Sequence, residues 1–144
     1  MMTFDPGAGE PATWAVCFAR KCVTAAFLPI GTYKHVRAFG VVEPINTWVF
    51  FDPAFKRTSI RLARGDAARE LVREFIFDAA VIQIAARERT RRPPIFGWCT
   101  PAVAHLLGLS SGALRPDALF RQCLRQGGEL LADGHTVTAA RTAG

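Results

Sequence analysis

A cysteine stands where an apolar helix is expected to begin. Cys99 lies in the stretch WCTPAVAHLLGL, just after a segment with two adjacent prolines. Thr100 followed by Pro101 is typical of a helix N-cap and the first helical position. The unpaired N–H groups of a helix N-terminus carry partial positive charge, which favours a thiolate over a thiol. Cys99 is therefore a candidate nucleophile, and its alternative is an inert thiol packed between Trp98 and the helix.

A nucleophilic thiol needs a base, and the chain holds three histidines. His105 is six residues beyond Cys99 on the same expected helix, where neighbours on one face are three or four residues apart. His135 belongs to the C-terminal tail. His35 stands at the start of an expected core strand and is the remaining candidate. Its alternative is an ordinary strand histidine with a structural partner.

The third member of such a site is an acid that orients the imidazole. Glu43 is eight residues beyond His35 on the same strand, roughly 26 Å away at the usual rise, which is too far. Asp52 ends the next expected strand. In a hairpin that pairs Glu43 with Asn46, Asp52 lies opposite Arg37 and diagonal to the histidine, on the same face. A slip of one residue would turn Asp52 to the other face, and a structural pair with Arg37 or a turn is its alternative.

A sheet and a helix must bring these three residues together. Apolar residues at helical spacing predict one helix from Ala67 and two more that begin near Pro101 and Pro116, with Gly108 or Gly112 ending the second. β-branched and aromatic runs predict strands over 14–20, 34–43, 47–53, 58–63 and 81–85. Residues 81–85 have an alternative as the end of the first helix, and their β-branched content favours the strand. The pattern indicates an α+β fold, a small antiparallel sheet packed against two or three helices.

Length and composition fit one globular domain, because 144 residues of which 50 % are apolar can bury a core. We expect a flexible leader over 1–13, the domain over 14–128 and a loose C-terminal tail over 129–144. No apolar run reaches the roughly 20 residues of a membrane span, so no membrane partner is expected. The absence of a signal-peptide pattern indicates a reducing compartment, where the four cysteines would be thiols.

The net charge of +6 would suit an acidic partner. A basic run could hold phosphate, and it consists of Arg87, Arg89, Arg91 and Arg92. This run lacks interleaved aromatic residues, so a solvated loop is its simpler interpretation. A zinc site would have to use Cys17 and Cys22 together with His35 and Cys99, but a C-x4-C spacing inside a strand is not a zinc knuckle. We expect neither a metal nor a cofactor.

The order of the motifs YKHV, WVFFDP, WCTPAVAHLLGL and LRPDALFRQCL resembles small uncharacterised proteins of tailed phages and prophages. A histidine strand, then an acid, then a cysteine helix is also similar to circularly permuted papain-like domains, relatives of the NlpC/P60 peptidases. The resemblance covers about residues 14–126. The chain departs from the pattern at Trp98, where the family has a small or polar residue, and at Pro101.

The resemblance implies a permuted papain-like fold and a cysteine hydrolase or acyl-transferase that acts on an amide, ester or thioester, such as a cell-wall peptide. Cys99 would be the nucleophile, His35 the base and Asp52 its orienting acid. The protein would then lie in the host cytoplasm or in the virion. The alternatives are an inactive virion-associated or assembly protein that keeps the fold as a binding scaffold, and a nucleic-acid-binding accessory protein.

Overall fold

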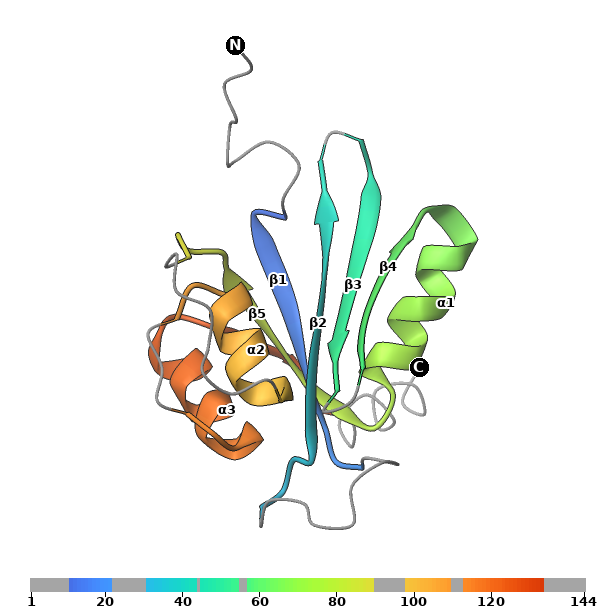
Figure 1. The fold of residues 1–144 in the computed structure, drawn as a ribbon. Helices are drawn as coiled ribbons and strands as arrows, with labels where there is room; N and C mark the ends of the chain where they lie inside the picture. Colours follow the sequence, from blue (N-terminus) through green and yellow to red (C-terminus); the bar gives the residue numbers. More distant parts are fainter. Residues whose placement is uncertain are drawn as a thin grey trace.

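Six strands form one antiparallel sheet in the order β4-β3-β2-β1-β5-β6, and three helices pack against it (Figure 1). The computed structural model describes residues 11–21, 31–43, 45–54, 57–89, 98–109 and 113–133. The strands are β1 (Thr13–Ala19), β2 (His35–Val42), β3 (Thr47–Pro53), β4 (Thr58–Ala63), β5 (Ala79–Ala85) and β6 (Glu129–Ala132). The helices are α1 (Gly65–Ile76), α2 (Cys99–Leu106) and α3 (Pro116–Arg125). The predicted α+β class is confirmed.

The hairpin of β2 and β3 has the register that the sequence predicts. Ala38 pairs with Phe51, and Val42 pairs with Thr47 at the other end of the ladder. Pairing Glu43 with Asn46 continues the same register into the turn. Asn46 has a φ of 52°, a left-handed conformation that asparagine tolerates better than most residues.

The helices divide between the two faces of the sheet, as Figure 1 shows with α1 on one side and α2 and α3 on the other. Alternating residues of each strand point to opposite faces. Phe39 and Phe50 face α1 and stack on each other at 5.7 Å, and Phe50 meets the Phe75 ring of α1 edge-on at 5.3 Å. Val36 and Ala38 belong instead to the core under α2 and α3. At β2, the sheet is therefore covered by α1 on one face and by α2 and α3 on the other.

Several element boundaries differ from those predicted. β6 pairs with β5 beyond the boundary expected at residue 128, so part of the predicted tail belongs to the sheet. β1 begins at Thr13, within the predicted leader, and α1 begins at Gly65 rather than Ala67. α2 begins at Cys99, before the expected cap. Residues 1–10 of the predicted leader and 134–144 of the predicted tail lie outside the described residues.

Candidate active site

The candidate site lies where β2 begins and β3 ends. The ladder between these strands stops at the pair of Ala38 and Phe51, although β3 continues to Pro53. Beyond that point, the backbone N–H of Val36 donates a hydrogen bond to the sulfur of Cys99. Because α2 packs against both strands, its first residue reaches the end of the ladder. Because β2 and β3 are no longer paired at this point, the N–H of Val36 is available to the thiol.

Two side chains from the hairpin meet at the same place. The Nε2 atom of His35 lies 2.5 Å from Oδ1 of Asp52, and both side chains are largely buried. The second carboxylate oxygen, Oδ2, lies 3.6 Å from Nη1 of Arg37. Asp52 therefore contacts both of the neighbours that the predicted register assigns to it. The expected pair with Arg37 and the expected contact with His35 occur together rather than as alternatives.

The imidazole of His35 also hydrogen-bonds to the side chain of Cys99. Burial by itself would lower the pKa of His35. The hydrogen bonds to Asp52 and Cys99 and the negative charges of these groups outweigh that effect and raise its pKa to about 9. The imidazolium form is therefore favoured at neutral pH.

The sulfur of Cys99 has three hydrogen-bond partners that stabilise its anion. Burial raises the pKa of this thiol, but the bond and charge of His35, the N–H of Val36 and the hydroxyl of Thr100 together lower it below the ordinary value. The hydroxyl of Thr100 lies 3.9 Å from the sulfur. A thiolate paired with an imidazolium is the state that this geometry favours.

The other described cysteines have the opposite character. Cys17 and Cys123 are fully buried, and burial raises the pKa of each thiol to about 12. Of the three cysteines that the structure describes, Cys99 is the one with a lowered pKa. Cys17 and Cys123 therefore resemble packed, inert thiols, whereas the lowered pKa of Cys99 does not fit that description.

The helix that carries Cys99 starts earlier than predicted. Trp98 is the N-cap, and Thr100, expected as the cap, is instead the second helical residue and fully buried. Pro101 therefore occupies the third helical position. The N–H groups of the first turn have no partner within a helix, so proline loses nothing there and the sequence alone does not decide among these positions.

The early start improves the electrostatics of the site. Ala102 N–H bonds to Trp98 O at 3.2 Å, and Pro101 has no N–H. The N–H groups of Cys99 and Thr100 thus remain without an intrahelical partner, next to the sulfur. The indole N–H of Trp98 donates to Leu114 O at 2.9 Å and anchors this end of the helix. Trp98 consequently has a structural role.

The remaining candidates lie elsewhere. His105 is in the last turn of α2, and His135 lies outside the described residues. In the basic run, Arg87 donates to the side chain and backbone oxygens of Gln126 at 2.7 and 2.8 Å. Arg89 donates to Leu106 O at 3.4 Å. These two arginines are tied to the helical layer, and Arg91 and Arg92 lie outside the described residues.

Of the residues considered for zinc, the structure brings His35 and Cys99 together. Cys17 lies in the core facing α1, and Cys22 is outside the described residues. Among the residues that the structure describes, no three histidine, cysteine or acidic side chains are placed to hold a metal ion.

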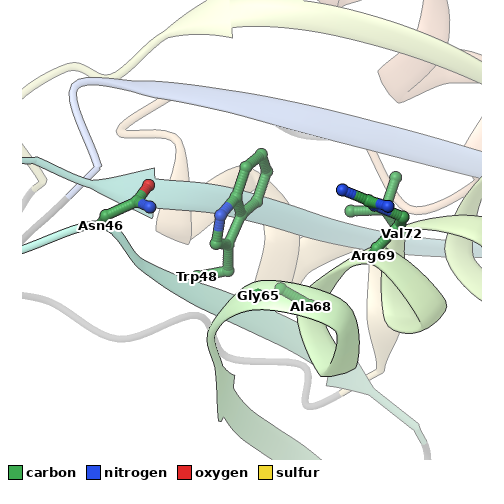
Figure 2. Close-up of a pocket in the computed structure, with 6 residues that line it drawn as sticks. All are labelled: Asn46, Trp48, Gly65, Ala68, Arg69 and Val72. Carbon is green, nitrogen blue, oxygen red and sulfur yellow. The ribbon is translucent and has the colours of Figure 1, made fainter.

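A hollow on the α1 side of the sheet is separate from the candidate site. Figure 2 shows the indole of Trp48 beside Asn46 and the first turns of α1. These residues line a hollow of about 380 Å³. Trp48 is four residues before Asp52 on β3, roughly 13 Å at the usual rise per residue. The thiol and imidazole do not line this hollow.

Sequence reasoning missed two partners of the thiol. The hydroxyl of Thr100 was assigned to the helix cap, because a threonine before a proline has that role more often. The N–H of Val36 leaves no mark in the sequence, since it becomes available only where the ladder of β2 and β3 stops. No residue type could have signalled it.

No protein-family model matches the chain, and neither a curated protein nor a solved structure matches it. In the part of the chain that the structure describes, no helix combines the length and apolar character needed to cross a membrane. The functional interpretation therefore depends on the geometry of the site.

Proposed function

We propose that the protein is a cysteine hydrolase or acyl-transferase with a permuted papain-like arrangement of its site. One observation carries the proposal: the imidazole of His35 hydrogen-bonds to Asp52 on one side and to Cys99 on the other. A nucleophile, a base and a group that orients the base are the three parts of such a site. Their order along the chain, histidine, acid and cysteine, is that of the permuted domains that the sequence resembles.

The reaction begins with the thiolate of Cys99. Its sulfur attacks the carbonyl carbon of an amide, ester or thioester, and the carbonyl oxygen becomes an oxyanion. The N–H groups of Cys99 and Thr100, free of intrahelical partners, are the donors nearest to it. His35 gives its proton to the leaving group as the bond to the carbonyl carbon breaks, which leaves an acyl-thioester on the sulfur.

The second half returns the enzyme to its starting state. His35, now neutral, takes a proton from water or from an acceptor alcohol or amine, and that nucleophile attacks the thioester carbonyl. The carbon–sulfur bond breaks, and the thiolate faces an imidazolium again. Asp52 keeps the ring oriented through Nε2 and stabilises its charge in both halves. The resemblance to NlpC/P60 relatives makes a cell-wall peptide the first substrate to test.

Selective alkylation tests the proposal. Iodoacetamide at neutral pH should modify Cys99 first, because the other described cysteines are buried with raised pKa values. His35→Ala should slow the modification of Cys99 by about tenfold or more, since the thiolate loses its counter-ion. His105→Ala is the matched control, because His105 lies outside the site on α2, the helix that carries Cys99. In this variant Cys99 should be alkylated at the wild-type rate. Peptide mass spectrometry gives the rate at each cysteine.

Turnover of simple thioester and ester substrates completes the test, with Cys99→Ser as the blank. Equal, slow alkylation of all cysteines, or the same rate in His35→Ala and His105→Ala, would leave a packed scaffold in place of an enzyme. A reactive Cys99 without turnover of esters or thioesters would narrow the substrate to amides such as wall peptides.

A further inference from the structure

Arg37 approaches the candidate site from the α1 side of the sheet. It follows His35 by two residues on β2, so both side chains start from the same face of the strand. Its guanidinium reaches two acceptors. Nη1 lies 3.6 Å from Oδ2 of Asp52, and Nη2 donates to Glu74 O at 2.8 Å. The side chain is 16 % exposed, so water competes little for these contacts.

Two residues in the last turn of α1, Glu74 and Phe75, form the binding site of this guanidinium, which we call its seat. Glu74 O is among the final four carbonyls of the helix, which have no intrahelical partner and carry partial negative charge. Arg37 satisfies one of them. The guanidinium also lies 4.2 Å from the centroid of the buried Phe75 ring, within the range of a cation–π contact.

A second arginine strengthens the same seat from the other neighbouring strand. Arg61 of β4 pairs with Phe50, two residues from Asp52, and its guanidinium lies 5.8 Å from the Phe75 ring. Its Nη2 lies 3.4 Å from Oε1 of Glu74. Asp52 is thus flanked by cationic side chains on both strands, and Glu74 and Phe75 contact both of them.

These contacts fix the carboxylate in one orientation. A carboxylate can rotate about its terminal bond, and only the orientations that turn one of its two oxygens toward Nε2 give the 2.5 Å contact with His35. Arg37 engages the opposite oxygen. An arginine fork matches this task because its donors lie in one plane and its position is set by three groups at once.

We propose that Arg37 is a positioning residue: seated by Glu74 and Phe75, it holds Asp52 so that its other oxygen faces His35. This inference rests on the proposed roles of Cys99 and the histidine. It adds a connection that the proposed mechanism does not contain, from the last turn of α1 through Arg37 and Asp52 to the base.

The test compares the pH dependence of Cys99 alkylation in Arg37→Met and in the wild type. Methionine keeps an unbranched stem over Phe75 but removes the charge and the donors. Asp52 is then no longer held toward His35, the imidazolium loses its oriented partner, and the thiolate forms only at higher pH. We expect the acid limb of the rate profile to move to higher pH, and the rate at neutral pH to fall about threefold to tenfold.

Two further variants separate positioning from general stability. Arg64→Met removes an arginine that bonds to Thr47 at the other end of β3, and its profile should match the wild type. Arg37→Lys keeps the charge without the planar fork. Its acid limb should stay near that of the wild type while its rate falls, and with an ester substrate the fall should appear in kcat rather than KM.

Circular dichroism and urea unfolding establish that each variant is folded. A folded Arg37→Met with the wild-type pH profile would overturn the positioning role. If Arg37→Met does not fold, a wild-type alkylation rate in Arg37→Lys would overturn it instead. Failure of the underlying function is distinguishable, because then Cys99 of the wild type would itself be unreactive or indifferent to His35→Ala.

Discussion

At the scale of residues, the environment of each thiol decides its chemistry. Cys17, Cys99 and Cys123 are the same side chain in one small domain. Burial raises the pKa of Cys17 and Cys123, whereas at Cys99 the hydrogen bonds and the charge of His35 together outweigh burial and lower the pKa. The difference arises because Cys99 stands at a helix start and faces an imidazole, a backbone N–H and a hydroxyl. A thiolate with three donors is stabilised by more than any one of them provides.

The hydroxyl of Thr100 provides a prediction at this scale. Thr100→Val keeps the shape of the buried side chain and removes the donor 3.9 Å from the sulfur. We expect the pKa of Cys99 to rise and its alkylation at a pH below that pKa to slow about twofold to tenfold, the value of one net hydrogen bond. Thr100→Ser, which retains the hydroxyl, should react like the wild type. Identical pH profiles for the valine and serine variants would remove Thr100 from the site.

At the scale of elements, α2 is held at both of its ends. Trp98 anchors the start through Leu114 O, and Gly108, two residues after the helix ends, has a φ of +72° in the left-handed region. Gly108 also passes close to the backbone of Arg87, where an added Cβ would lie 2.6 Å from the carbonyl oxygen. The end of α2 opposite to Cys99 is therefore fixed by a close backbone approach that only glycine permits.

Two glycines at helix ends make a matched pair for a prediction. Gly127 follows α3 with a φ of +92°, but an added Cβ would meet nothing within 4 Å. Gly127→Ala should lower the free energy of unfolding by about 1 kcal/mol through backbone strain alone. Gly108→Ala adds the clash with Arg87 and should cost about 3 kcal/mol. Urea unfolding checks this order, and equal costs would contradict the close approach.

At the scale of the whole molecule, the site joins the two layers. α2 brings Cys99, the proposed nucleophile, from one face, while Glu74 and Phe75 of α1 contact Arg37 on the other. The hairpin of β2 and β3 lies between them and carries His35 and Asp52, the proposed base and its orienting acid. Neither layer contains a complete site, so its chemistry requires the folded domain as a unit.

The sequence predicts much of this arrangement because its information is local. Alternation and a turn define the hairpin register that sets Asp52 beside His35, and three histidines leave few choices for a base. Which helix covers each face of the sheet depends on contacts between residues far apart in the sequence. Ile60 and Leu62 alternate like core residues in β4 but are 65 % and 69 % exposed, since α2 and α3 cover other strands. β6 is four residues long, too short to show a strand period.

The protonation of His35 tests the central claim most directly. Nuclear magnetic resonance of its ring protons across a pH titration should give a pKa of about 9 in the wild type, because Asp52 and the Cys99 anion outweigh burial. In Cys99→Ala the pKa should fall, since one of the two negative partners is gone. A His35 that titrates near the ordinary value of 6.5, with or without the thiol, would contradict the thiolate–imidazolium pair.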